Sequence, residues 1–148
     1  MSINHTSTLN TLSALISLLA LDRLPRTGWA LAGVEDPETI AGHVLSTAHL
    51  VLALAPRVEP PLDVDRAIAL TVIHDSPEAW TGDIPKHASE QLPPGAKKQL
   101  EARAADSLLS SLSQTARARH EEYARGESRE ASFVRLCDKL QLGVQLLV

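Results

Sequence analysis

The sequence contains a single cysteine, Cys137, among its 148 residues. One thiol excludes an internal disulfide framework and favours a protein of a reducing compartment. Cys137 lies among apolar residues and directly before Asp138. Free cysteines are usually buried, so we interpret Cys137 as a small core residue.

Basic residues are scarce as well. The chain has 14 Lys and Arg against 18 Asp and Glu, which gives a net charge of −4. Nucleic acid polymers are bound mainly through basic faces, so this balance argues against such a partner. It leaves room for a small phosphorylated molecule held by one or two local cations.

A long hydrophobic run is also missing. The apolar stretch 12–21 is too short to span a bilayer. It lacks the basic segment and the cleavage site of a signal peptide. We therefore interpret it as a packed helix of a soluble, cytoplasmic protein that has no membrane partner.

The sequence has no period-2 alternation and no internal repeat, and its apolar residues recur at helical spacing throughout. Together with the length, this pattern predicts a single all-α domain over residues 1–148, a bundle of about five or six helices. The helices that we expect span residues 7–22, 36–55, 63–75, 95–113, 117–125 and 128–148.

Capping signals set several of these boundaries. Asp36, which precedes Pro37, predicts the N-cap of the second helix, and Asp63 predicts the N-cap of the third. Gly126 predicts a C-terminal cap. Apolar spacing predicts the inward face of the first helix: Leu9, Leu12, Ile16 and Leu19. In the same way it predicts the inward face of the last helix: Phe133, Leu136, Leu140, Val144 and Leu147.

Polar residues at the ends and in the middle of apolar helices are the most informative feature. His74 and Asp75 follow the apolar run 67–73, where an imidazole and a carboxylate are costly to desolvate without compensation. A carboxylate at a helix C-terminus also opposes the helix dipole. Taken alone, His43 is more often a core or boundary residue, and Asp138 is more often a partner in a surface ion pair.

Considered together, these four residues predict a site for one divalent transition metal. Imidazole nitrogens combined with carboxylate oxygens suit Mn, Fe, Co, Ni or Zn. Four protein ligands around an ion that prefers six leave positions for water and for a substrate oxygen. Such an ion lowers the pKa of a bound water and polarises a phosphoryl oxygen. The candidate ligands are His43, His74, Asp75 and Asp138.

Further residues are candidates for catalysis and substrate binding. Glu78 is placed to act as a general acid or base, or as a carboxylate that favours a helix N-terminus. Arg26 offers a fork for phosphate and Trp29 a flat face for a base, although such a pair, taken alone, is more often a surface Arg and a core Trp. Asp83 is either an acceptor for a sugar hydroxyl or a turn residue.

An ordered set of short motifs extends over most of the chain from residue 23 onward. The motifs are residues 26–29 (RTGW), 37–43 (PETIAGH), 73–79 (IHDSPEA), 82–85 (GDIP) and 138–140 (DKL). In this set the sequence resembles the HD-domain metal phosphohydrolases, and within them the 5′-deoxynucleotidase branch. Members of that branch are all-α bundles, typically dimers, that hydrolyse deoxyribonucleoside 5′-monophosphates to nucleoside and phosphate.

The resemblance implies a role for each candidate residue. The implied metal ligands are His43, His74, Asp75 and Asp138. The implied catalytic carboxylate is Glu78. The positions that match nucleotide contacts are Arg26, Trp29 and Asp83. We accordingly expect a metal-dependent phosphohydrolase that forms a homodimer and acts on a small nucleotide.

The chain departs from the family pattern in three places. Gly42 stands where relatives usually carry an acidic residue before the histidine, and Pro77 is less usual after the His-Asp pair. The sequence ends at Val148, soon after Asp138, so it is short at the C-terminus relative to relatives. We expect that a partner subunit completes the bundle or that this is a reduced member of the family.

Two alternatives remain open from the sequence. A di-iron oxygenase of the HD type needs additional histidine ligands, for which His87 and His120 are available. A nucleotide-binding module without turnover is suggested by Gly42 and by the short C-terminus.

Overall fold

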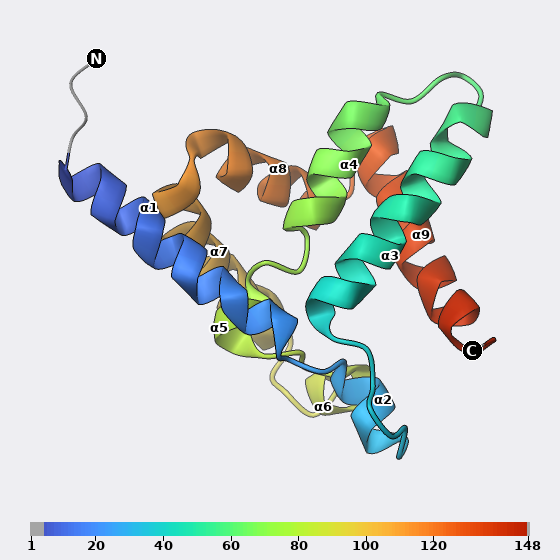
Figure 1. The fold of residues 1–148 in the computed structure, drawn as a ribbon, viewed down its shortest axis with the longest axis horizontal. Helices are drawn as coiled ribbons and strands as arrows, with labels where there is room; N and C mark the ends of the chain where they lie inside the picture. Colours follow the sequence, from blue (N-terminus) through green and yellow to red (C-terminus); the bar gives the residue numbers. More distant parts are fainter. Residues whose placement is uncertain (1–4, 148) are drawn as a thin grey trace. The chain divides into compact units, whose positions relative to one another are not determined.

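The computed structural model of the protein describes residues 5–147. Within this range the chain is helical and forms no β-strand, which confirms the all-α prediction. None of its helices in this range is both long and apolar enough to cross a membrane. The helices of Figure 1 are α1 (His5–Leu18), η1 (Leu19–Asp22), α2 (Thr27–Leu31), α3 (Ile40–Leu54), η2 (Ala55–Arg57), α4 (Val64–Ile73), α5 (Glu78–Thr81), α6 (Lys86–Ser89), α7 (Ala96–Leu112), α8 (Gln114–Arg125) and α9 (Arg129–Gln145).

The helices are more numerous than the five or six expected, because short helices occupy segments between the long ones. Helix α2 lies in the stretch 23–35, which the sequence predicts as a loop, and α6 follows Pro85. Helix α5 begins at Glu78, directly after Pro77. Proline is well tolerated at a helix start, because the amide hydrogen that it lacks has no partner there.

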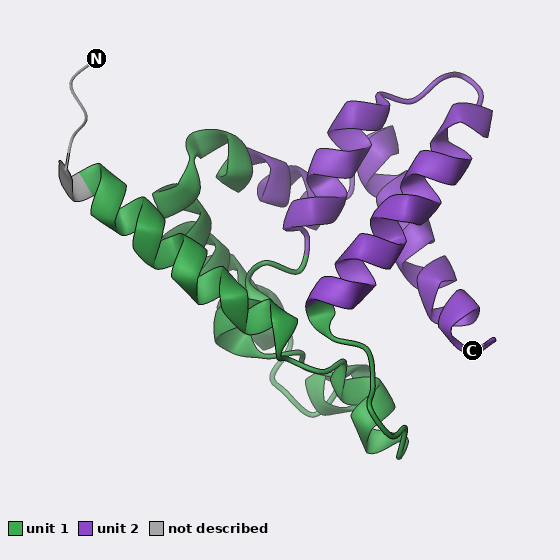
Figure 2. Cartoon of the chain, in the orientation of Figure 1, with its two compact units in different colours: residues 1–40, 75–117 green, residues 41–74, 118–148 purple. Residues whose placement is uncertain are grey.

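The residues divide into two compact units, each built from two stretches of chain (Figure 2). The first unit comprises residues 1–40 and 75–117, and the second comprises residues 41–74 and 118–148. The expectation that residues 1–148 form one domain remains a prediction.

In the first unit, helix α1 packs along α7. The hydroxyl of Thr11 on α1 donates a hydrogen bond to the Ser111 carbonyl on α7 over 2.8 Å, and Ala14 is buried on α1. The predicted inward face of this helix is wrong. Between 51 and 65% of the surface of its four members is exposed: Leu9, Leu12, Ile16 and Leu19.

The segment before α3 is extended, so the predicted N-cap at Asp36 is wrong. Asp36 adopts a left-handed conformation with φ 60°, and α3 begins at Ile40. The reason is a backbone pairing with the segment before α2. The Arg26 amide donates to the Glu38 carbonyl and the Ile40 amide donates to the Leu24 carbonyl, each over 2.9 Å. These two bonds hold residues 38 and 39 outside the helix.

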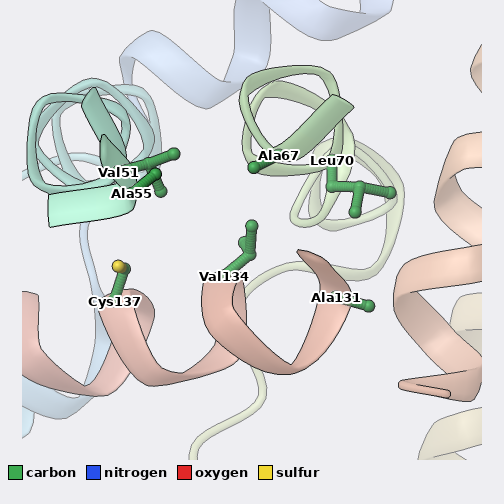
Figure 3. Packing of buried hydrophobic residues seen from close by; sticks show 7 residues of the cluster. All are labelled: Val51, Ala55, Ala67, Leu70, Ala131, Val134 and Cys137. Atoms are coloured by element: carbon green, nitrogen blue, oxygen red, sulfur yellow. The ribbon is translucent and has the colours of Figure 1, made fainter. Parts of the chain in front are cut away.

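The core of the second unit lies where α3, η2, α4 and α9 meet (Figure 3). Several of its members are alanines, which allow helices to approach closely. The cluster consists of Val51, Ala55, Ala67, Leu70, Ala131, Val134 and Cys137. The position of Cys137, whose surface is fully buried, confirms that it is a core residue.

The predicted inward face of the last helix is largely wrong. Phe133 packs against the core in part, whereas the other four residues are exposed: Leu136, Leu140, Val144 and Leu147. The buried face of α9 consists instead of Ala131, Val134, Cys137 and Gln141. Helix α9 therefore turns a face that includes a polar amide toward the interior.

The predicted caps at Asp63 and Gly126 are confirmed, and Ser128, where the last helix was expected to begin, is a further cap. The Asp63 carboxylate accepts a hydrogen bond from the Arg66 amide over 2.9 Å, at the start of α4. Ser128 caps α9 by accepting from the Ala131 amide over 3.1 Å. Gly126 follows α8 with φ 69°, a conformation that glycine adopts without strain, and its amide donates to the Glu122 carbonyl.

The carboxylate of Glu122 on α8 joins three parts of the second unit. It accepts hydrogen bonds from Arg66 on α4 over 2.8 Å, from Arg119 on α8 over 3.0 Å and from Ser128 over 2.7 Å. Burial raises the pKa of Glu122. The hydrogen bonds that it accepts outweigh this effect, so its pKa lies below the ordinary value.

A carboxylate with a lowered pKa stabilises the fold above the pKa of the unfolded chain, and this contribution is lost as the pH falls through the folded pKa. We expect Glu122→Gln to lower the urea midpoint at pH 7. Its difference from the wild type should shrink as the pH falls below about 4.3, where unfolded glutamate titrates. Glu90→Gln, at an exposed position, serves as the control. A difference that is independent of pH would contradict this role of Glu122.

Burial raises the pKa of the Cys137 thiol to about 11. At pH 8 the thiolate fraction should fall from about a quarter, for a free thiol of pKa about 8.5, to roughly one in a thousand. We therefore expect an aromatic disulfide reagent to label the native protein at least roughly 100-fold more slowly than the urea-unfolded protein. Because the chain has one thiol, absorbance at a single wavelength measures both rates. Equal rates would show that Cys137 is accessible and ionised.

Candidate functional site

His43 lies on α3, in the second unit, and its surface is fully buried. Both nitrogens of its ring face side chains of α9. Nδ1 lies 2.8 Å from Oε1 of Gln141, and Nε2 lies 3.0 Å from Oδ1 of Asp138. Asp138 and Gln141 are three residues apart, so they lie on one side of the helix. The sequence predicted His43 and Asp138 as partners in one site, and the structure brings them together.

His74 follows α4 directly and is also buried. Its Nδ1 lies 2.6 Å from the backbone carbonyl oxygen of Thr71. The His74 ring lies 5.7 Å from that of His43 and 5.1 Å from that of Tyr123, between ring centroids. The two histidines that the sequence selected are therefore neighbours within the second unit.

The hydrogen-bond partners determine what each imidazole can do. A carbonyl oxygen only accepts, so Nδ1 of each ring carries the hydrogen and Nε2 carries the lone pair. One ring nitrogen of His43 lies within 4.8 Å of one ring nitrogen of His74. Two neutral imidazoles arranged in this way are the donor set that a divalent transition metal prefers.

The contact between His43 and Asp138 points to a cation. With the hydrogen on Nδ1, Nε2 of His43 presents a lone pair to a carboxylate oxygen 3.0 Å away. Two acceptors at that distance repel each other, and a positive charge that both of them contact removes the repulsion. A proton on Nε2 or a metal ion would supply that charge, so the contact between His43 and Asp138 fits a shared cation.

Asp75 is joined to His74 by the peptide bond and belongs to the first unit. Its Oδ2 lies 3.6 Å from Nη1 of Arg26, with both side chains largely buried. Burial raises the pKa of Glu101 on α7, Lys97 lowers it, and the negative charge of Asp75 raises it further. The carboxylates of Asp75 and Glu101 are therefore close enough for their charges to disfavour each other.

Glu78 is the first residue of α5 and is buried. Its backbone amide donates to the Asp75 carbonyl over 3.0 Å, so the two residues are held in one tight turn. Its position at a helix N-terminus agrees with the structural role that the sequence offered for it. The same position keeps its carboxylate within one turn of Asp75.

The loop that carries Arg26 is fastened to Asp83. The Thr27 amide donates to Oδ2 of Asp83 over 2.7 Å, and the Thr27 hydroxyl donates to the Asp83 carbonyl over 2.8 Å. Nε1 of Trp29 donates to Oε1 of Glu38 over 3.2 Å. Arg26, Trp29 and Asp83 are thus part of one hydrogen-bonded region of the first unit.

Three contributors to the site were not predicted from the sequence: Gln141, the Thr71 carbonyl and Tyr123. A signal for Gln141 exists, because it lies three positions after Asp138 and therefore on the same side of the predicted helix. A backbone carbonyl leaves no trace in a sequence. Tyr123 follows a run of charged residues on α8, where nothing suggests a partner for His74.

The two histidines that an oxygenase would need are placed differently. His87 is exposed on α6 in the first unit, and His120 is buried on α8 in the second. Among the described residues, no group of three potential metal ligands includes either of them.

Comparisons with known proteins identify the family. A family model described as an HD domain matches residues 20–148. The 5′-deoxynucleotidase HDDC2 of Mus musculus is 34% identical over 131 residues, an alignment that spans 84% of this chain and 62% of the mouse protein. The 5′-deoxynucleotidase hdd1 of Schizosaccharomyces pombe is 29% identical over 151 residues, which span 97% of this chain and 74% of the yeast protein.

A solved structure shares the fold. The crystal structure of the PH0347 protein from Pyrococcus horikoshii superposes on this chain with a TM-score of 0.80 and 32% sequence identity. The match covers 90% of this chain and 75% of the Pyrococcus chain. The chain spans only about three fifths of the length of the HDDC2 relatives from mouse and cattle that it matches.

Proposed function

The chain belongs to the HD-domain family, and from this premise we propose that it is a metal-dependent phosphomonoesterase that hydrolyses nucleoside 5′-monophosphates, deoxynucleotides above all. The relatives from mouse and fission yeast carry the name 5′-deoxynucleotidase, which supports this substrate class. The observation that carries the proposal is the pair of buried imidazoles, His43 and His74, whose Nδ1 atoms both face oxygen acceptors.

Four residues would hold one divalent transition metal: His43, His74, Asp75 and Asp138. Support comes from the contact between His43 and Asp138 and from the peptide bond between His74 and Asp75. Mn, Co, Fe, Ni and Zn all suit two imidazoles with two carboxylates, so the donor set does not select among them. When bound, the ion supplies Lewis-acid chemistry, which activates water and polarises a phosphoryl oxygen.

Glu78 manages the protons in this proposal. Hydrolysis forms a bond between a water oxygen and phosphorus and breaks the bond between phosphorus and the 5′ oxygen of the sugar. Glu78 takes a proton from the water and returns it to the 5′ oxygen, so that nucleoside and phosphate leave. Its burial supports the role, because a desolvated carboxylate is a stronger base.

The segment 26–29 serves substrate binding. The guanidinium of Arg26 is a rigid fork that matches phosphate oxygens, and its ion pair with Asp75 keeps it beside one of the proposed ligands. Trp29 offers an aromatic face to the base. Asp83 positions this loop through Thr27, and it acts on the sugar only if its second oxygen is available when the nucleotide is bound.

The two other hypotheses are weaker. The oxygenase needs His87 or His120, and neither belongs to a ligand group among the described residues. A binding module without turnover is distinguished by experiment. The homodimer and the cytoplasmic location remain predictions from the family resemblance and from the composition.

The first test is release of inorganic phosphate. The full chain, treated with chelator and reloaded with Mn²⁺ or Co²⁺, should release phosphate from dAMP, dGMP or dUMP, and chelator should abolish the release. Asp138→Ala should lower the rate at least roughly 100-fold, because it removes a ligand of the ion. Asp106→Ala, at an exposed position on α7, is the control. Nucleotide binding without phosphate release from any monophosphate would favour the binding module.

The second test concerns Glu78. Removal of a general acid or base typically lowers a rate by about 10²- to 10⁴-fold, so we expect Glu78→Ala to lower kcat by this factor. Metal affinity, measured by titration calorimetry, should remain close to that of the wild type because Glu78 is not a ligand. Glu90→Ala is the matched control on an exposed position of the same unit. A kcat that Glu78→Ala leaves unchanged would overturn the proton-transfer role.

A further inference from the structure

We infer that Gln141 is a positioning residue: it accepts the Nδ1 hydrogen of His43 and thereby holds Nε2 in the form that binds a metal. The hydrogen bond between Gln141 and His43 does not depend on the proposed function. Its consequence for a metal rests on the proposed function.

Burial makes this bond a constraint. Gln141 is 2% exposed and His43 is fully buried, so water does not compete for either group. A buried N–H that loses its acceptor is left unsatisfied, which costs stability. The 2.8 Å separation of Nδ1 and Oε1 is that of a well-formed hydrogen bond. The amide oxygen therefore favours the hydrogen on Nδ1 and leaves the lone pair on Nε2, facing Asp138.

The two imidazoles are fixed by different means. Nδ1 of His74 faces the backbone carbonyl of Thr71 in the preceding turn of its own helix, which no substitution can remove. Nδ1 of His43 faces a side chain on α9, a different helix from its own. A substitution of Gln141 therefore changes the hydrogen-bond partner of His43 and leaves that of His74 unchanged.

Three substitutions of Gln141 separate the effect of its acceptor oxygen from the effects of side-chain size and polarity. Gln141→Leu keeps the approximate size and removes the acceptor. Gln141→Asn keeps the amide but withdraws it by one methylene, out of reach of Nδ1. Gln141→Glu keeps an acceptor at full length. Gln99→Leu makes the same chemical change at an exposed position of α7 and is the control.

The first measurement uses the metal-free full chain. Long-range ¹H–¹⁵N correlation spectra, at a pH at which the imidazoles are neutral, report which ring nitrogen carries the hydrogen. We expect the Nδ1–H form for both His43 and His74 in the wild type. In Gln141→Leu and Gln141→Asn, His43 should shift toward the Nε2–H form while His74 keeps Nδ1–H. An Nε2–H form of His43 in the wild type would overturn the inference, because Gln141 would then present its NH₂ group.

The second measurement is the affinity for Mn²⁺ or Co²⁺ alone, by titration calorimetry. Loss of a partner that orients a ligand typically costs 10- to 100-fold in metal affinity, and we expect this loss for Gln141→Leu and Gln141→Asn. Gln141→Glu should bind at least as tightly as the wild type, and Gln99→Leu should match it. Wild-type affinity in both Gln141→Leu and Gln141→Asn would overturn the positioning role.

The two measurements fail independently. A wild-type chain that binds neither ion would contradict the proposed metal-dependent function, while the ring spectra would still decide whether Gln141 fixes the imidazole of His43. Should Gln141→Leu fail to fold, Gln141→Asn and Gln141→Glu give the same comparison of a missing and a present acceptor.

Discussion

The complete burial of His43 is the constraint from which much of the second unit follows. An imidazole away from water needs partners for its ring nitrogens, and both nitrogens face α9: Gln141 accepts the hydrogen of Nδ1, and Asp138 lies beside Nε2, where the two share a cation. Turning this side of α9 inward turns Leu136 and Leu140 outward, because they lie on another side of the helix. The core closes nonetheless, since Ala131, Val134 and Cys137 are small enough for α9 to approach α3 and α4 (Figure 3). The buried face of α9 therefore combines small apolar residues with polar pairing to His43.

Sequence patterns predicted those features that depend on neighbours in the chain. Asp63, Ser128 and Gly126 cap helices through bonds to residues three or four positions away, and all three lie where the sequence placed a helix boundary. The predicted N-cap at Asp36 is wrong because backbone groups of residues 24–26 pair with residues 38–40, a contact that local capping signals do not reveal. The inward faces of α1 and α9 failed because a count of apolar residues assumes that leucines point inward. The residues that are buried there include a small one, Ala14, and a polar one, Gln141.

The candidate site was predicted as a set of residue types rather than as a geometry. His43 and His74 could be selected because an imidazole on an apolar helix is costly to desolvate. The structure then places the two rings 5.7 Å apart between centroids. Asp83 shows the limit of the approach. The sequence offered a sugar contact or a turn, whereas its carboxylate holds the Thr27 amide, so its main effect falls on the loop that carries Arg26 and Trp29. A residue that positions a loop and a residue that contacts a substrate look alike in a sequence.

The neutral amide of Gln141 also fits the charge of the proposed site. His43 and His74 would bind as neutral rings, so Asp75 and Asp138 alone would balance a divalent cation. An additional carboxylate at position 141 would orient His43 equally well but would leave the site with a net negative charge. The substrate of a phosphomonoesterase is itself an anion, and a negative site would repel it over the distance at which Arg26 attracts it. Glu101 gives an example of such repulsion near Asp75. Burial raises the pKa of Glu101, Lys97 lowers it, and the negative charge of Asp75 raises it further. An amide therefore provides the acceptor that His43 requires while preserving the neutrality that a phosphate-binding site requires.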